Sequence, residues 1–475
     1  MTRRFAPFVE RIAHEGGNDP WALHWEARHA AARGEDVIVL SVGDPDLSTP
    51  VPVVETAVAK LRAGDTHYTE SGGRPVLRAA IAAQHQQRTG QLVTADNTVV
   101  LSGTQNGLFV ASLCVAGPGD EVIAIDPMYT TYPATIRASG ATLVRVPAPA
   151  AAAFRPDLAA LEAAVTARTR AVFLATPNNP TGVVLSAAEV DGLAAIARRH
   201  GLWIVSDEVY AGVADGGSVP SLATRLPEQV LTVGSLSKTH AMTGWRAGWI
   251  VGPPDFIEHA DALAQCMLYG LPGFIQEAAI TALAMAGPAE AEVRDYCRVR
   301  RELLFRELHE VPGIRAYWPD AGMFMLLDVR ASGLATADFV RRLYAAERVS
   351  LLDGAAFGRE TEGFVRACFA AEEAALVEAA RRIRRFCTRL AAGCESLSRR
   401  RPASQAVGRR DADRARPVAE LVLLHRRRQR RRVGAIRRVA DVALYQRVVQ
   451  HRARVKQVVD EGGDRPRSQV NAGAQ

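Results

Sequence analysis

Lysine is scarce in this chain of 475 residues, because only Lys60, Lys238 and Lys456 stand among its 58 lysines and arginines. Cysteine is also sparse: there are six residues and no CxxC pair, which argues against a zinc ribbon or a disulfide framework. No apolar run reaches the roughly 18 residues that a membrane-spanning helix needs, and the N-terminus lacks the apolar region of a signal peptide. We therefore expect a cytoplasmic protein with reduced thiols, no metal site and no membrane segment.

The positive charge of the chain is confined to its end. Residues 391–475 carry 21 basic and 8 acidic side chains, whereas residues 1–390 carry 37 basic and 43 acidic ones. The basic tail has a single aromatic residue, Tyr445, and no recognisable nucleic-acid-binding module, so its charge does not predict a nucleic-acid partner. We expect a disordered or partly helical extension, or sequence translated past the usual end of the protein.

Short runs rich in Val, Ile and Leu alternate with helical patterns through the first part of the chain. The runs lie at 99–103, 121–126, 171–176, 202–207, 229–235 and 247–252. Strands that alternate with helices predict an α/β protein with a mostly parallel sheet, which is covered on both faces.

The pattern changes near residue 275. Long helical stretches lead to shorter strands at 322–329 and 363–370, and an amphipathic helix closes the region near residue 393. We expect a smaller α+β domain here, with residues 35–48 packed against it. The predicted divisions are an N-terminal arm (1–48), a large domain (49–274), a small domain (275–393) and the basic tail (394–475).

Lys238 is the lysine with an unusual setting. It directly follows a predicted strand, Ser235 and Ser237 precede it, and Arg246 follows eight residues later. Hydroxyl groups and a guanidinium suit a phosphate monoester, and a lysine beside a phosphate suggests a Schiff base with pyridoxal phosphate. The alternative for a single lysine is a solvated surface position.

Polar residues follow other predicted strands at the edge where open α/β sheets bind ligands. Asp207 ends one strand and could keep a pyridine nitrogen protonated, although a helix N-cap is an equal alternative. Tyr210 could donate to the 3′-oxygen of that ring, and Asn179 lies in a proline-rich turn. The turn 102–107 presents backbone N–H groups to an anion, and Tyr129 could either stack on the ring or belong to the core.

Six segments together resemble the class I/II aminotransferases, which are pyridoxal-phosphate enzymes of fold type I. The segments are SVGDPDLSTP, HYTESGG, LSGTQ, TPNNPTG, SDEVY and SLSKTHAMTGWRAGW, and they occur in the order and spacing of that family. The resemblance covers about residues 5–390. It implies a large domain with a seven-stranded sheet, a smaller domain, a ping-pong reaction between an amino acid and a 2-oxo acid, and a homodimer.

The resemblance also implies residue roles. Lys238 forms the Schiff base and moves the substrate proton, Asp207 holds the pyridine nitrogen, and Tyr129 stacks on the ring. The remaining roles are Asn179 and Tyr210 at the 3′-oxygen; Gly103, Thr104, Gln105, Ser235, Ser237 and Arg246 at the phosphate; Tyr68 at the phosphate of the neighbouring subunit; and Gly43, Asn179 and Arg366 at the substrate α-carboxylate.

Further stretches resemble the arginine–pyruvate transaminases of bacterial arginine catabolism. They are RIAHEGGNDPWALHWEA, IVLSVGDPDLSTP, LAQCMLYGLPGFIQ and GMFMLLDVRASGL. A guanidinium substrate needs an acidic or carbonyl partner, for which Glu70 and Asp353 are candidates beside the alternative of solvated loop acids.

Three other functions stay open from the sequence. Aspartate, alanine and aromatic transaminases share the cofactor motifs, and a C–S lyase would keep the same fold and cofactor. A transcriptional regulator with an aminotransferase-like domain is disfavoured, because only about 34 residues precede the first predicted strand and a winged helix would not fit there.

Overall fold

The computed structural model describes residues 20–217 and 219–398, together with Phe5, Val9, Glu10 and Ile12. The predictions for the tail beyond residue 398 lie outside the described residues. Among the described helices, none has the length and apolar character needed to cross a bilayer.

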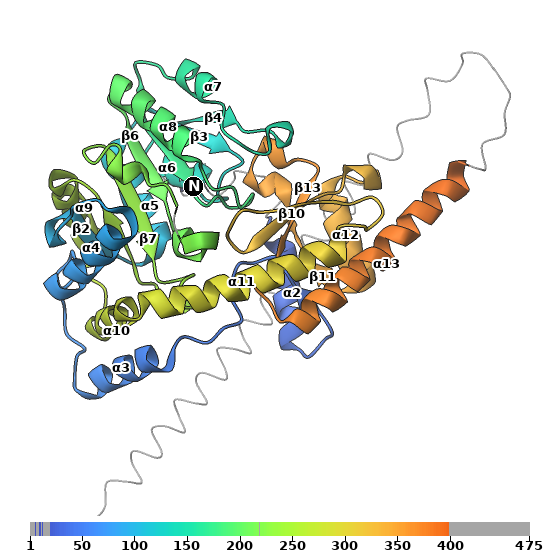
Figure 1. The fold of residues 1–475 in the computed structure, drawn as a ribbon, viewed down its shortest axis with the longest axis horizontal. Coiled ribbons are helices and arrows are strands. Elements are labelled where there is room, and N and C mark those ends of the chain that lie inside the picture. The colour runs from blue at the N-terminus through green and yellow to red at the C-terminus, as the bar shows by residue number, and fades with distance from the viewer. Residues whose placement is uncertain (1–4, 6–8, 11, 13–19, 218, 399–475) are drawn as a thin grey trace, which may run out of the picture. The chain divides into compact units, whose positions relative to one another are not determined.

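A seven-stranded sheet forms the larger layer of the molecule (Figure 1). Its strands are, in spatial order, β2 (Thr98–Leu101), β8 (Gly248–Val251), β7 (Val230–Ser235), β6 (Trp203–Asp207), β5 (Thr169–Ala175), β3 (Glu121–Asp126) and β4 (Thr142–Pro147). β8 runs antiparallel to both of its neighbours, and the other pairs are parallel. The predicted α/β class and the mostly parallel seven-stranded sheet are therefore confirmed.

Helices cover both faces of this sheet, as its strands require. β2, β3, β7 and β8 are buried along their whole length, so neither side of them faces solvent. One face packs against α5 (Gly103–Val115), α6 (Tyr132–Ala138) and α9 (Pro254–Met267). The other face packs against α7 (Leu158–Ala163), α8 (Ala187–His200), α3 (Val51–Arg62), α4 (Pro75–Thr89) and α10 (Gly273–Ala284).

A second, antiparallel sheet lies beside the first. Its order is β12 (Leu352–Asp353), β13 (Phe364–Cys368), β10 (Phe324–Asp328) and β9 (Arg315–Tyr317). Its hydrophobic core includes side chains of α11 (Ala286–Leu308), α12 (Thr336–Glu347), α13 (Glu373–Ser398) and, from its first turn, α2 (Ala22–Ala32). The N-terminal strand β1 (Ile38–Val39) pairs with β11 (Val349–Ser350), and Leu40 lies in the same hydrophobic core.

Two elements differ from the sequence-based expectations. β4 was not predicted, because it is the edge strand of its sheet and most of its residues are partly or fully exposed, which leaves no apolar run. The closing helix α13 continues to Ser398 rather than ending near residue 393, and Gly393 does not stop it. The division into a large and a small domain stays a prediction.

Candidate active site

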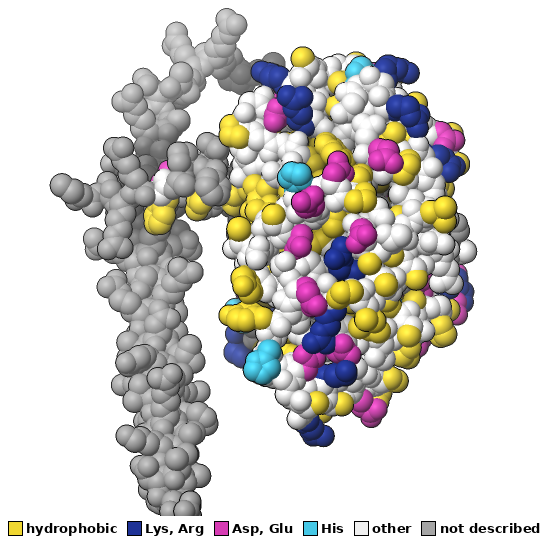
Figure 2. Space-filling view, turned by 90° about the vertical axis from the view of Figure 1, so that its left-hand side faces the viewer, with side chains coloured by type: hydrophobic (Ala, Val, Ile, Leu, Met, Phe, Trp, Pro, Cys, Tyr) yellow, Lys and Arg dark blue, Asp and Glu magenta, His cyan; other side chains and the backbone are white. Residues whose placement is uncertain are grey.

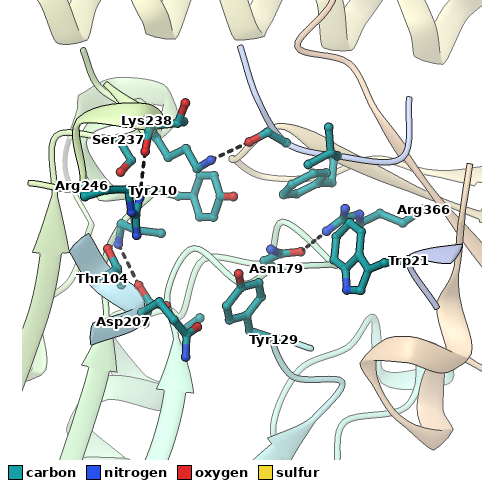
Figure 3. A pocket seen from close by; sticks show the side chains of 17 residues that line it. Trp21, Thr104, Tyr129, Asn179, Asp207, Tyr210, Ser237, Lys238, Arg246 and Arg366 are labelled. Atoms are coloured by element: carbon teal, nitrogen blue, oxygen red, sulfur yellow. Dashed lines mark hydrogen bonds between the residues drawn. The ribbon is translucent and has the colours of Figure 1, made fainter. Parts of the chain in front are cut away.

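The site is a pocket at the carboxyl ends of β5, β6 and β7, closed on its other side by the second sheet and by the segment after β1 (Figure 3). Open α/β sheets place ligands at this edge. The lining residues are Trp21, Val42, Gly43, Thr104, Gln105, Tyr129, Ala175, Asn179, Asp207, Val209, Tyr210, Ser237, Lys238, Thr243, Arg246, Phe324 and Arg366. Every residue predicted for the cofactor or the α-carboxylate lines this pocket except Gly103, Ser235 and Tyr68, and the two candidates for the guanidinium, Glu70 and Asp353, do not line it either.

Lys238 lies in the turn after β7 and extends its amine across the pocket. Its Nζ donates a hydrogen bond to the carbonyl oxygen of Gly43 at 2.5 Å, so the amine meets the segment that follows β1 (Figure 3). Burial lowers the pKa of Lys238, while the negative charge of Asp44 opposes that effect. A lysine with a lowered pKa has a larger neutral fraction, as a nucleophile or a base requires.

Asp207 ends β6 and is buried at the bottom of the pocket. Its carboxylate accepts hydrogen bonds from the Val209 amide at 3.2 Å and the Tyr132 hydroxyl at 3.5 Å. Burial raises the pKa of Asp207 to about 7, and the neighbouring carboxyl of Glu208 adds to that effect. A positive charge beside this carboxylate would restore its ionised form.

The turn into α5 and the turn after β7 lie together and form a polar corner of the pocket, apart from Asp207. The Thr104 hydroxyl lies in the first turn of α5 and is buried without a hydrogen-bond partner. Arg246 points its guanidinium at this turn: a Cβ atom at Gly103 would collide with it, so only glycine permits the close approach. Arg246 itself has a left-handed backbone (φ 56°), a strained conformation that is common at functional sites.

Arg366 reaches the pocket from the middle of β13. Its guanidinium donates to Asn179 Oδ1 at 2.9 Å and to the carbonyl oxygen of Ser41 at 2.8 Å, and it lies 3.8 Å from the centre of the Phe324 ring. Its Nε is buried and has no hydrogen-bond partner. Burial lowers the pKa of Arg366 to about 10, so the group stays charged at neutral pH and retains N–H groups for an anion.

Comparison with known proteins agrees with this geometry. The family described as aminotransferase class I and II matches residues 35–383. The chain belongs to the class I and II aminotransferases.

Its relatives include enzymes with different donors. The arginine–pyruvate transaminase AruH of Pseudomonas aeruginosa is 43% identical over 73% of this chain and 89% of its own length. An aspartate aminotransferase of Streptomyces avermitilis is 33% identical over 65% of this chain and 77% of its own. The solved aspartate aminotransferase of Thermus thermophilus with maleate superposes with a TM-score of 0.76 at 32% identity, covering 81% of this chain and all of that one. The fold type I assignment is thus confirmed.

Pyridoxal phosphate is the cofactor of this aminotransferase family, and the pocket fits it. The unpartnered Thr104 hydroxyl, the N-terminus of α5 and Arg246 suit the phosphate, because they supply hydrogen-bond donors and positive charge at one corner. At the other end, buried Asp207 suits a protonated ring nitrogen. Ser235 lies beneath the lining layer, where its hydroxyl accepts from the Ser237 amide at 3.4 Å.

Six lining residues were missed by the sequence analysis: Trp21, Val42, Ala175, Val209, Thr243 and Phe324. Trp21 precedes α2 and is distant in sequence from every cofactor motif; its only signal was the resemblance of its surroundings to arginine–pyruvate transaminases. Phe324 lies in an apolar strand, where the sequence pattern predicts that an aromatic residue belongs to the hydrophobic core.

Tyr68 does not join the aminotransferase pocket of its own chain. Its side chain is 86% exposed and packs edge-on against Tyr269, with ring centres 5.0 Å apart. Glu70, on the same loop, is exposed. Asp353 caps the short helix that follows it by accepting from the Ala355 amide at 3.0 Å, and it is not a lining residue either.

Proposed function

We propose that this aminotransferase moves the α-amino group of L-arginine to a 2-oxo acid such as pyruvate, in two half-reactions of a ping-pong cycle. The observation that carries the proposal is the placement of Lys238 between two charged groups of opposite sign, Asp207 and Arg366, in one pocket. The choice of arginine is supported by the 43% identity with the arginine–pyruvate transaminase.

In this proposal the pocket residues bind pyridoxal phosphate through all of its polar groups. Asp207 keeps a proton on the ring nitrogen, and Asn179 and Tyr210 donate to the 3′-oxygen. Tyr129 stacks on the ring. The phosphate is bound by the turn Gly103–Gln105, Ser235, Ser237 and Arg246.

The substrate is held by its α-carboxylate. The Nε–H of Arg366 has no partner and is available to this carboxylate, with the Gly43 backbone on the other side. The bound cofactor supplies a carbonyl carbon for the amino group and a ring that withdraws electrons. The amine of Lys238 would accept the proton from the substrate Cα and return it to the former carbonyl carbon of the cofactor, which would then carry the amino group. Burial of the amine favours this role, because it lowers the pKa of the lysine.

A twofold homodimer completes the proposed site. Class I and II aminotransferases commonly form dimers, and the exposed Tyr68 is available to a neighbouring subunit's phosphate. Figure 2 shows hydrophobic side chains exposed among charged ones on the side of the molecule where α3, α4 and α9 lie in Figure 1. The exposed apolar residues of these helices include Val51, Val54, Val58, Leu61, Val76 and Met267. Such a surface suits burial against a second copy.

The guanidinium of arginine needs an acidic or carbonyl partner, and Asp207 is the only carboxylate among the lining residues of the described pocket. Since Asp207 serves the ring nitrogen, we assign the guanidinium to Glu70 of the neighbouring subunit, carried on the Tyr68 loop. Asp353 is less suited because a backbone amide already occupies its carboxylate.

A panel of amino donors tests the proposal. Purified protein loaded with pyridoxal phosphate should convert L-arginine and pyruvate to L-alanine and the 2-oxo acid of arginine, faster than it uses aspartate or phenylalanine. Preference for aspartate would overturn the arginine assignment. Release of pyruvate and ammonia from cystathionine without amino transfer would show a C–S lyase instead.

A further inference from the structure

A row of buried polar groups adjoins Arg366 and is formed by residues of α2, of the segment after β1 and of β11. The carbonyl oxygen of Ser41 accepts from Arg366, and the Ser41 side chain points to a second pair of groups. Its hydroxyl oxygen lies 2.9 Å from Nδ1 of His24 and accepts from the Ser350 hydroxyl at 3.0 Å. His24 is 5% exposed, and both serines are fully buried.

His24 connects these polar groups to the wall of the pocket. It lies on α2, one turn after Trp21, and the two rings meet edge-on with centres 5.6 Å apart. Trp21 lines the pocket beside Arg366 (Figure 3). The same imidazole therefore contacts a lining side chain and the residue whose carbonyl positions Arg366.

One protonation state satisfies all three groups. If the Ser350 hydroxyl donates to Ser41, the Ser41 hydroxyl is free to donate to Nδ1 of a neutral imidazole. Burial lowers the pKa of His24, and the positive charges of Arg28 on α2 and Arg366 on β13 lower it further, so the neutral form prevails at neutral pH.

The His24–Ser41 hydrogen bond can influence the pocket because the segment that contains Ser41 contacts two of its charged side chains. Within three residues its backbone carbonyls accept from Arg366, at Ser41, and from Lys238, at Gly43. The backbone of Leu40, just before Ser41, is held on both sides, because its N–H donates to Ser350 and its carbonyl oxygen accepts from Cys368. Beyond Leu40, the side-chain bonds of Ser41 hold the part of the segment that carries these two carbonyls.

We propose that His24 is a positioning residue for substrate binding: by accepting the Ser41 hydroxyl, it holds the Ser41 carbonyl oxygen where Arg366 needs it to grip an α-carboxylate. The inference rests on the proposed role of Arg366. It predicts a defect common to every substrate that carries an α-carboxylate, whatever its side chain.

The test compares His24→Leu with His24→Asn in the cofactor-loaded enzyme. Leucine removes the acceptor, whereas the Asn Oδ1 occupies nearly the place of Nδ1. 2-Methylalanine has an α-carboxylate but no Cα hydrogen, so it reports binding alone through the cofactor absorbance. His24→Leu should raise its Kd about tenfold, the cost of one buried hydrogen bond, with His24→Asn within about twofold of wild type.

Steady-state kinetics should show the same pattern. His24→Leu should raise KM for arginine, alanine and pyruvate by one common factor while kcat changes less than about twofold. His29→Leu, an exposed position on the same helix, is the matched control and should change nothing. If His24→Leu does not fold, Ser41→Ala removes the same hydrogen bond with little change in volume and should give the same rise in Kd.

An unchanged Kd, a loss confined to kcat, or an Asn variant as impaired as the Leu variant would overturn the proposal. Failure of the proposed function is distinguishable: a wild-type enzyme that does not use arginine refutes the arginine assignment, but the binding of 2-methylalanine still decides the role of His24.

Discussion

Asp207 and Arg366 are buried charges of one pocket, but they come from sheets of opposite construction. Asp207 ends a parallel strand, while Arg366 lies in the middle of an antiparallel one. Burial shifts both pKa values toward the neutral form, upward to about 7 for Asp207 and downward to about 10 for Arg366. Among the described residues, no salt bridge compensates either group.

The opposite charges of Asp207 and Arg366 suit them to bind different groups. A cation such as a protonated ring nitrogen would stabilise a buried carboxylate that has no ion pair. An anion such as a substrate carboxylate would stabilise a buried guanidinium that has none. Under the proposed function, the large sheet presents the cofactor end of the pocket and the small sheet presents the substrate end. Lys238 joins the two sides of the pocket, since it follows β7 and donates to Gly43 in the segment after β1.

The largest effect is expected where the two ends meet. Lys238→Ala removes the proton carrier and should lower kcat by about 10⁴-fold or more. It should also abolish the absorbance band of the lysine-bound cofactor. Lys60→Ala is the matched control, because Lys60 lies on α3 and pairs with Glu277 at 2.7 Å on the surface. Undiminished turnover in Lys238→Ala would refute the central assignment.

At the cofactor end, Asp207→Asn keeps the shape of the side chain and removes its charge. We expect kcat to fall by about 10²–10³-fold, because the ring loses the group that holds its proton, while KM changes little. The cofactor absorbance and its pH dependence should change as well. A variant with normal kcat and a raised KM would assign Asp207 to the substrate instead.

At the substrate end, Arg366→Lys should change KM more than kcat, the opposite of what is expected for Asp207→Asn. A lysine keeps the charge but loses the planar donor pair, so KM for amino acids and 2-oxo acids should rise by about 10²-fold. Cofactor absorbance and affinity should stay at the wild-type values. If this variant loses the cofactor, the two ends of the pocket do not act separately.

The same contrast explains what the sequence could predict. Asp207 follows an apolar run that is recognisable as a strand, and the rule for ligands at strand ends then points to it. Arg366 interrupts an apolar strand, and its residue type alone indicates a surface ion pair; only the family resemblance identified it. Trp21 was missed because its place in the pocket depends on how α2 packs, which no local pattern encodes.

A smaller effect is expected for the guanidinium partner. Glu70→Gln should raise KM for arginine about tenfold, as the loss of one charge-assisted hydrogen bond at a partly exposed site would, and leave KM for alanine unchanged. Asp353→Asn is the comparison, since its carboxylate caps a helix and should affect both donors equally. Equal KM values for arginine in Glu70→Gln and wild type would refute the assignment.

An effect of about the same size is expected on stability without the cofactor. Because the pKa of Asp207 is raised in the folded protein from 3.8 to about 7, the folded state binds this proton more tightly than the unfolded state does. The resulting stabilisation is fully present below the unfolded pKa and is lost as pH rises through about 7. Asp207→Asn cannot titrate, so cofactor-free variant and wild type should diverge with pH. Urea unfolding measures this difference. Between about pH 5 and about pH 8, the free energy of unfolding of the wild type should fall by about 1–3 kcal/mol relative to that of the variant. A constant difference would show that Asp207 is already ionised in the empty pocket, and the contrast with Arg366 would then rest on geometry alone.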